Sequence, residues 1–222
     1  GSMTSSSPKQ TPKRRSHTER VELAERRMFD ATEALILEVG TQKTTLKEVG
    51  ERAGYSRGQA HARFGSKEEL FLRLADRCRN IWLEELDLAA GNKRGLAAFL
   101  SRMDAMVSYA NRYPSDARVM YILWFESVGS PSAMKTGLSR FHAQAREDIQ
   151  HLIEQARQAG EVAEDIDPAE FAMHFTSTLF GMSYQWVVNP SAVEPFPLIN
   201  AIRRQMLLIL RPTNSAGLDR SN

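Results

Sequence analysis

Apolar side chains recur every three or four positions along most of this 222-residue chain, which is the spacing of one face of an α-helix. Gly and Pro interrupt the pattern at intervals and mark where helices begin and end. No segment shows the apolar–polar alternation that is typical of a β-strand. The pattern therefore predicts an all-α protein, with helices at 18–39, 45–54, 56–64, 66–90, 94–112, 115–128, 132–159, 168–188 and 196–211.

Residues 44–71 carry the most specific pattern. Thr45 is a suitable N-cap residue, and Glu48 occupies the capping-box position three residues later. Gly54 stands where a chain leaving a helix often needs a left-handed residue, and Ser56 can cap the next helix. Two short helices joined by a tight turn predict a helix-turn-helix, whose second helix enters the major groove of DNA.

The charges of this segment favour contact with DNA. From Arg52 to Lys67 all formally charged residues are basic, and phosphates attract such a run whatever the base sequence. The same spacing also fits a solvated helical hairpin inside a larger α protein. Periodicity and charge alone leave both interpretations open.

The composition and the charge distribution bear on whether, and where, the chain binds DNA. The chain has 42% hydrophobic residues, enough for a substantial core, and a net charge of only +2. Residues 1–80 hold 16 Lys/Arg and 11 Asp/Glu, a balance of +5, whereas residues 81–222 hold 13 and 16, a balance of −3. This asymmetry predicts that nucleic acid binds only to the N-terminal part of the chain. The single cysteine, Cys78, excludes an internal disulfide framework and is expected to be a small buried hydrophobe, with a redox sensor as the alternative.

Four segments follow from these patterns. Residues 1–18 form a basic tail that is expected to be disordered, either as a solubilising leader (its first residues read as a tag remnant) or as an arm that touches DNA. Residues 19–66 form the predicted DNA-binding domain, and residues 67–212 a larger helical domain. Residues 213–222 are expected to be a disordered tail. The helix predicted at 66–90 runs from one domain into the other, so its tilt would move the recognition helix.

The stretch from Arg20 to Phe71 resembles the N-terminal domain of the tetracycline-repressor (TetR) family. The matching residues, in order, are Ala31, Ala34, Leu35, Gly40, Thr44, Thr45, Leu46, Val49, Ala53, Gly54, Ser56, Arg57, Gly58, Phe64, Ser66, Lys67, Glu68, Glu69 and Leu70. The resemblance implies a three-helix DNA-binding domain followed by a larger helical domain for ligand binding and dimerisation. It further implies a homodimeric repressor of a palindromic operator in double-stranded DNA, released by a small and largely apolar effector.

The resemblance also assigns roles on the DNA. The residues expected to face bases are Arg57, Gln59, Ala60 and His61, and those expected to hold phosphates are Thr45, Arg63 and Lys67. The Gln59 amide can pair with adenine, and Lys67 combines its charge with a helix N-terminus. Family members often carry Tyr at the position of His61 and a larger apolar residue at that of Ala60.

The larger domain is expected to do two things. The resemblance implies that helices 168–188 and 196–211 pair with a second copy in a homodimer; alternatively, their apolar residues only close the monomer core. Met and aromatic side chains suit an adaptable ligand pocket but equally a plain core. The pocket candidates are Trp82, Met103, Met106, Tyr109, Trp124, Phe125, Phe141 and Phe175, with Asp104, His142 and His174 as polar groups that would orient a ligand.

Two rival functions remain. A small helical enzyme is one, but no Walker loop, Cys-x-x-Cys or His-Glu-x-x-His sequence occurs, so we expect no catalysis, cofactor or metal. A non-specific architectural DNA-binding protein is the other, and the low net charge disfavours it. No apolar run approaches the roughly 20 residues that cross a bilayer. We therefore expect a cytoplasmic protein with no membrane partner.

Overall fold

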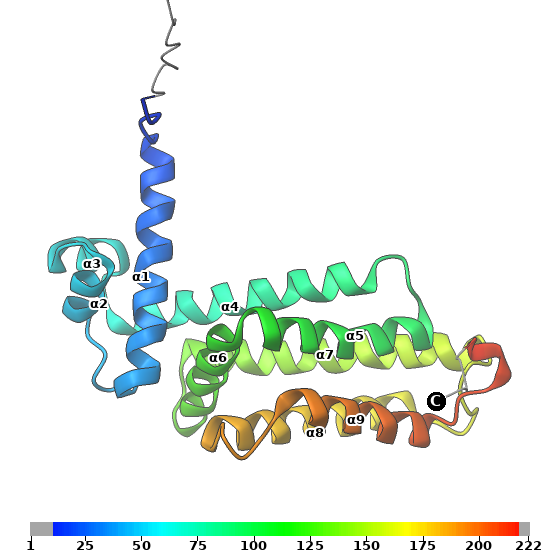
Figure 1. Ribbon diagram of the computed structural model, residues 1–222. Coiled ribbons are helices and arrows are strands. Elements are labelled where there is room, and N and C mark those ends of the chain that lie inside the picture. The colour runs from blue at the N-terminus through cyan, green and yellow to red at the C-terminus, as the bar shows by residue number, and fades with distance from the viewer. Residues whose placement is uncertain (1–10, 218–222) are drawn as a thin grey trace, which may run out of the picture.

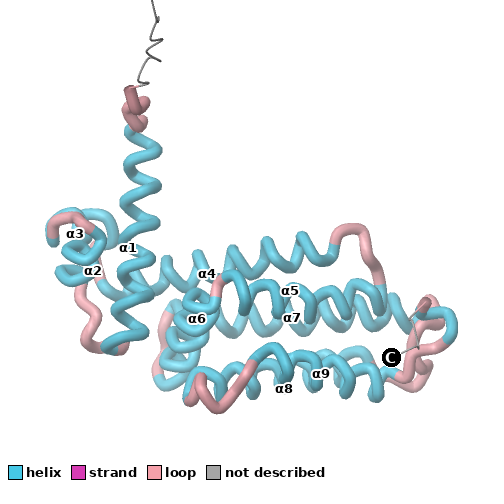
Figure 2. The backbone as a smooth tube through the Cα atoms, in the orientation of Figure 1, coloured by secondary structure: helices cyan, strands magenta, loops and turns pink. Residues whose placement is uncertain are grey.

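The computed structural model describes residues 11–217, and within that range the chain folds into nine α-helices and no β-strand (Figures 1 and 2). The helical content of 79% confirms the predicted all-α fold. No described helix is both long and apolar enough to span a membrane. The helices are α1 (His17–Val39), α2 (Leu46–Ala53), α3 (Arg57–Phe64), α4 (Lys67–Ala90), α5 (Gly95–Arg112), α6 (Pro114–Glu126), α7 (Ala133–Gln158), α8 (Pro168–Val188) and α9 (Pro195–Leu210).

Helices α1, α2 and α3 gather at one end of the molecule, beside an elongated body built from α4 to α9 (Figure 1). Each of the three begins at a hydroxyl side chain: Ser16, Thr45 and Ser56 each accept a hydrogen bond, 3.2 Å long, from the backbone N–H three residues on. These caps satisfy N–H groups that have no partner inside a helix. The side chains buried between the three helices include Met28, Phe29, Ile36, Val49 and Phe64.

Two glycines make the tight junction between α2 and α3 possible. Gly54 ends α2 in the left-handed region, at φ 85° and ψ 23°, which costs a glycine little. Gly50 lies where the two helices meet, and a Cβ atom there would stand 2.8 Å from the carbonyl oxygen of Ser56. The close approach of α2 and α3 therefore depends on the missing side chain.

Helix α4 joins the small domain to the body. Its buried residues Leu70, Leu74 and Cys78 belong to a core cluster that starts among α1 to α3 and continues to Val119 and Leu123 of α6. Helices α1 and α6 also pack directly against each other. The two domains are thus connected by packed side chains as well as by the continuous helix.

A second core fills the far end of the body, where α5, α7, α8 and α9 lie side by side (Figure 1). Phe99 of α5 packs edge-on against Phe171 and Phe175 of α8, with ring centroids 5.3 and 4.8 Å apart. Ile153 of α7 and Met206 of α9 complete the contact from the other helices. Apolar residues that recur at helical spacing in four of the predicted helices therefore pack against one another.

The helix bounds agree with the sequence prediction to within two residues. Two expectations about the tails are wrong. The tail predicted to be disordered over residues 1–18 ends earlier, because His17 and Thr18 already belong to α1. The tail predicted to be disordered from residue 213 begins with an ordered turn, because Thr213 N–H donates to Glu161 O at 2.9 Å and Asn214–Ala216 forms a 3-10 helix. The rest of that tail, and residues 1–10 of the basic tail, lie outside the described residues. The division between domains at residues 66 and 67 stays a prediction, although it coincides with the start of α4.

Candidate functional site

The exposed face of α3 is the first candidate site. The helix starts at Ser56, whose hydroxyl oxygen accepts from Gln59 N–H, while the Gln59 side chain accepts from Ser56 N–H at 2.8 Å. This reciprocal capping box fixes the beginning of the helix. Phe64 points into the core, whereas Arg57, Gln59 and His61 are exposed. The structure thus presents three of the four predicted base-facing residues to solvent.

Ala60 does not share that face. Its side chain is fully buried, with 0% exposed, and a Cβ atom at Gly50 would stand 3.3 Å from the Ala60 Cβ. The expectation that Ala60 faces bases is therefore wrong. A small residue is needed here because α2 and α3 approach closely, and that requirement comes from packing between helices.

Two of the three phosphate candidates, Arg63 and Lys67, are engaged within the protein. Arg63 lies 3.6 Å from the carboxylate of Glu25 on α1, which also pairs with Arg73 at 2.7 Å. The Nζ of Lys67 donates to Gln42 O at 3.1 Å and so holds the loop before α2. Arg63 would have to leave Glu25 to reach DNA, so its phosphate contact stays a prediction that this geometry does not favour.

Several exposed side chains around the N-terminus of α2 form no ion pair with a described residue. Thr45 is exposed at the helix N-terminus, with its hydroxyl oxygen accepting from Glu48 N–H. Lys43 and Lys47 are exposed on either side of it, and neither forms an ion pair with any described residue. The sequence reasoning passed over these two lysines because they precede the basic run from Arg52. Their exposure beside the N-terminus of α2 makes them candidates for phosphate contacts.

The same turn also satisfies a hydrolase pattern. Residues 54–58 read GYSRG, which matches the Gly-x-Ser-x-Gly pattern of a nucleophile elbow. That motif requires a strand before the serine, and here the preceding element is helix α2. Because the Ser56 hydroxyl oxygen caps α3, the pattern is explained by helix capping.

The second candidate site is a cavity of about 90 Å³ inside the body. Its lining comes from six helices, α4 to α9, and is mostly aromatic and aliphatic. Six of the eight predicted pocket residues line it, namely Trp82, Met106, Tyr109, Trp124, Phe141 and Phe175. The lining residues that sequence reasoning missed include Arg102, Tyr121, Phe180, Met182, Ser183 and Trp186.

Met103 and Phe125 do not line the cavity. Met103 is 1% exposed and belongs to the second core, on the α5 face that meets Phe99 and its neighbours. The Phe125 ring stacks on Tyr121 and packs edge-to-face with Tyr184, with centroids 5.8 and 5.5 Å apart. Both side chains have helical spacing that fits core and pocket alike, so the sequence does not separate the two roles.

The three polar residues that were expected to orient a ligand do not line the cavity either. Asp104 is exposed and pairs with Arg203 at 2.5 Å, and His174 is exposed on α8. His142 contacts the Phe180 ring at 4.2 Å without lining the cavity. The charged residue that does line the cavity is Arg102. Its spacing of four residues from Met106 on one helix face is the sequence signal that could have located it.

Two family profiles match the chain. The profile of bacterial regulatory proteins of the tetR family matches residues 29–74, and that of the tetracyclin repressor-like C-terminal domain matches residues 95–191. The chain belongs to the TetR family. TetR-family proteins are non-enzymatic DNA-binding regulators, so this chain is a DNA-binding transcriptional regulator and not an enzyme.

The individual TetR-family proteins that resemble this chain are only distantly related to it in sequence. The uncharacterised HTH-type transcriptional regulator YfiR of Bacillus subtilis (strain 168) is 30% identical over 79 residues, which is 36% of this chain and only 38% of that protein. SmeT, the repressor of the Stenotrophomonas maltophilia efflux pump SmeDEF, superposes with a TM-score of 0.70 at 20% identity, over 89% of this chain and 94% of its own. NalD of Pseudomonas aeruginosa superposes with a TM-score of 0.65 at 19% identity, over 86% of this chain and 96% of its own. At such identities the structural likeness shows the shared fold.

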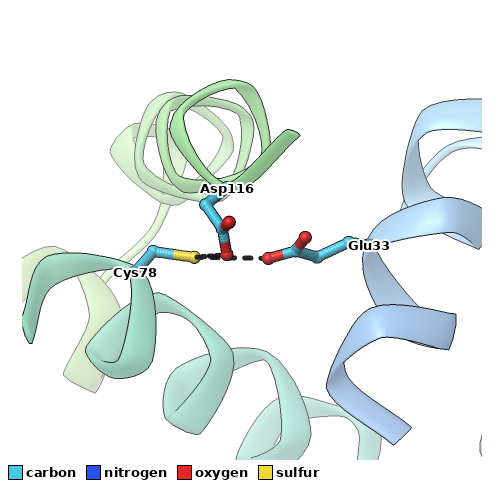
Figure 3. Close-up of side chains that lie close together, drawn as sticks. All are labelled: Glu33, Cys78 and Asp116. Carbon is cyan, nitrogen blue, oxygen red and sulfur yellow. Dashed lines mark hydrogen bonds between the residues drawn. The ribbon is translucent and has the colours of Figure 1, made fainter. Parts of the chain in front are cut away.

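A buried polar cluster occupies the junction between the two domains of this TetR-family chain (Figure 3). Cys78 Sγ of α4 lies 3.6 Å from Glu33 Oε1 of α1 and 3.7 Å from Asp116 Oδ1 of α6. Burial and then the hydrogen bond and like charge of Asp116 raise the pKa of Glu33 to about 9. Glu33 is therefore protonated at neutral pH.

The cluster brings together one thiol and two carboxylates, a set that can hold a metal ion. Metal ligands must be deprotonated, yet burial raises the pKa of both Glu33 and the Cys78 thiol, and the positive charge of Arg77, which lowers both pKa values, does not overcome the effect of burial. These features favour a protonated, hydrogen-bonded junction over a metal centre. A buried thiol with a raised pKa is also a poor target for oxidants, which disfavours a redox sensor.

Proposed function

We propose that this TetR-family chain is a homodimeric repressor of a palindromic operator and that a small, largely apolar ligand in the cavity releases it. The observation that carries the proposal is the position of α4. This single helix holds Lys67 and Leu70 beside the helix-turn-helix and Trp82 in the cavity wall. Trp82 lies 15 positions after Lys67, which corresponds to about 22 Å along the helix.

Exposed apolar side chains support dimerisation through α8 and α9. A monomer seldom leaves many large apolar groups in contact with water on neighbouring helices. The exposed fraction of Leu208 is 77%, of Val188 66% and of Tyr184 56%. The other exposed large apolar residues of α8 and α9 are Met173, Phe196, Leu198 and Ile209.

A dimer would offer two copies of α3 to DNA. A helix-turn-helix pair reads a palindrome when its recognition helices lie about 34 Å apart, one turn of the duplex. Arg57 and His61 are exposed on α3, and neither side chain has a hydrogen bond or ion pair to any described residue, so both side chains are available for base edges. Lys43 and Lys47 then supply charge for the flanking phosphates.

Ligand release requires that the ligand bind one spacing of the DNA-binding domains better than the other. The cavity touches α4 through Trp82 and α6 through Trp124, and both helices share a core cluster with α1. A ligand that shifts these helices would therefore reposition the helix-turn-helix. A coupling of about 1–3 kcal/mol changes operator affinity about 5–150-fold, which is enough for a switch.

The structural neighbours support the choice of a repressor with an aromatic ligand. SmeT and NalD are each named as repressors of a multidrug efflux pump. SmeT has also been solved with triclosan, and that complex gives a TM-score of 0.71 at 20% identity, over 89% of this chain and 96% of its own. The aromatic lining of the cavity in this chain fits a ligand of comparable character.

The experiment that tests the proposal is selection from a pool of random DNA duplexes at physiological salt, followed by sequencing of the retained DNA. We expect a palindrome whose half-sites are centred about 10 base pairs apart. Retention of DNA with no common motif would favour a non-specific architectural protein. Recovery of a single asymmetric half-site would contradict the homodimer.

A further inference from the structure

Arg102 of α5 is an unusual residue for its position. It is the charged residue among the cavity-lining side chains, most of which are aromatic or aliphatic. Among the described residues, its guanidinium has no hydrogen bond and no ion pair within 4.0 Å. The cavity therefore contains a cation without a direct counterion.

The surroundings of Arg102 disfavour its charge. Burial lowers the pKa of its guanidinium, and the carboxylate of Asp148 on α7 acts in the opposite direction without overcoming it. Asp148 is exposed and accepts a hydrogen bond from Gln144 at 2.8 Å. An arginine stays protonated even so, and a partly buried charge without a partner costs free energy that a paired charge does not.

The lining also contains neutral donors, among them the indole N–H groups of three tryptophans, but two of its hydroxyl groups are already engaged. The Thr176 hydroxyl donates to Ala172 O at 2.9 Å, and the Ser183 hydroxyl donates to Leu179 O at 2.9 Å. These hydroxyl hydrogens are therefore committed to the backbone of α8. A ligand with a hydrogen-bond acceptor would find its strongest donor in the guanidinium, whose planar fork matches a carboxylate.

We infer that the cavity binds small amphipathic monocarboxylates, with the carboxylate on Arg102 and an aromatic body among the rings of Trp82, Trp124 and Phe141. The inference rests on the proposed function only in taking this cavity as the effector site. The volume of about 90 Å³ suits a single ring once flexible wall residues adjust. Met106 and Met182 line the wall, and methionine side chains repack readily.

The three tryptophans of the chain, Trp82, Trp124 and Trp186, all line this cavity. Intrinsic tryptophan fluorescence therefore reports directly on occupation, with no DNA present. The probes are benzoate, which is ionised at pH 7, and its neutral isostere benzamide. We expect the wild-type chain to bind benzoate at least about 10-fold more tightly than benzamide, because only benzoate can form a charge-assisted hydrogen bond with Arg102.

Arg102→Gln should abolish this preference, so that the two probes bind alike. Arg140→Gln is the matched control, because Arg140 is exposed on α7 and does not line the cavity; this variant should keep the preference. Equal affinity of benzoate and benzamide in the wild type, or binding of neither, would overturn the inference without using the variants. Preference retained in Arg102→Gln would overturn it as well. Because the titration contains no DNA, such a failure leaves the operator test of the proposed function unaffected.

Discussion

Gln59 combines a structural and a recognition role in one side chain. Its Oε1 accepts from Ser56 N–H and caps α3, which leaves the amide NH₂ group on the exposed face of the helix. An adenine pair uses both ends of the amide, so the oxygen would have to serve the cap and the base together. The sequence predicts the exposure of Gln59 but not the shared use of its oxygen.

Gln59→Ala should relax base preference at one position in each half-site, and it should also lower the free energy of unfolding by about 1 kcal/mol through loss of the cap. Sequencing of selected duplexes measures the first effect, and urea unfolding the second. Ser56→Ala is the control, because it removes the hydroxyl cap and leaves the Gln59 amide in place. Unchanged preference in Gln59→Ala would remove Gln59 from the base-reading residues.

Glu33 makes stability depend on pH. Its pKa rises from 4.5 in the unfolded chain to about 9 in the folded one, so between these values the folded state holds a proton that the unfolded state has lost. Its stabilising contribution is complete below pH 4.5 and is lost as pH rises to 9. The free energy of unfolding should fall over that window by at most about 1.4 kcal/mol per pH unit from this group.

Glu33→Gln should flatten this dependence and stabilise the fold at pH 8 relative to the wild type, because an amide has no proton to lose. Urea unfolding at pH 6, 7 and 8 measures the slope. Glu22→Gln, on the exposed side of α1, should leave the slope as it is. An identical slope in wild type and Glu33→Gln would show that Glu33 is not the responsible group.

Residues whose roles depend on packing between distant helices were the ones the sequence did not reveal. Ala60 lies next to Gln59 and three residues from Arg57, yet it is fully buried where α3 approaches Gly50 of α2. Arg63 belongs to a basic run, yet Glu25, 38 positions earlier, draws it toward α1. Local charge and periodicity carry no information about such partners.

At the scale of elements, the junction of α2 and α3 tolerates no side chain at Gly50. Gly50→Ala would place Cβ 2.8 Å from the Ser56 carbonyl oxygen, a backbone atom at the start of α3 that cannot move aside as a flexible side chain would. We expect a loss of about 1–3 kcal/mol in the free energy of unfolding and weaker DNA binding. Thermal unfolding and DNA titration measure the two effects.

Gly58→Ala is the matched control for stability. A Cβ atom at Gly58 meets only the Ser56 hydroxyl oxygen, at 3.9 Å, and the residue lies inside α3, where alanine favours the helix. This variant should be as stable as the wild type or slightly more stable. Equal destabilisation by Gly50→Ala and Gly58→Ala would contradict the close-packing account of the junction.

Helix bounds were the most predictable feature at this scale, because local chemistry determines them. Ser56, Ser66 and Gly54 act within one turn of the ends they mark, so their effect is visible in the sequence. The ordered turn after Arg211 was not visible. It depends on the contact of Thr213 with Glu161, on a segment 52 residues away in the chain.

For the whole molecule, the proposed dimer predicts that a charge on the exposed face of α9 separates the protomers. Leu208→Lys should weaken self-association at least about tenfold, because a buried ammonium group would have no partner across the two-fold axis. Leu208 is 77% exposed in the single chain, so the monomer fold should be unaffected. Sedimentation velocity over a range of concentrations measures the change.

Leu88→Lys is the control, since Leu88 is 75% exposed and belongs to α4, which lies on the opposite side of the body from α8 and α9 (Figure 1). This variant should associate as the wild type does. If Leu88→Lys dissociated the dimer and Leu208→Lys did not, the interface would lie on α4 rather than on α9.

The central claim is that two copies of this chain read one palindrome. The direct measurement is sedimentation of the chain with a duplex that carries the selected palindrome, beside the same duplex with one half-site scrambled. We predict a complex of two chains on the intact site, and at least about tenfold weaker binding when one half is lost. A complex of one chain per duplex, bound equally well to both DNAs, would contradict the account.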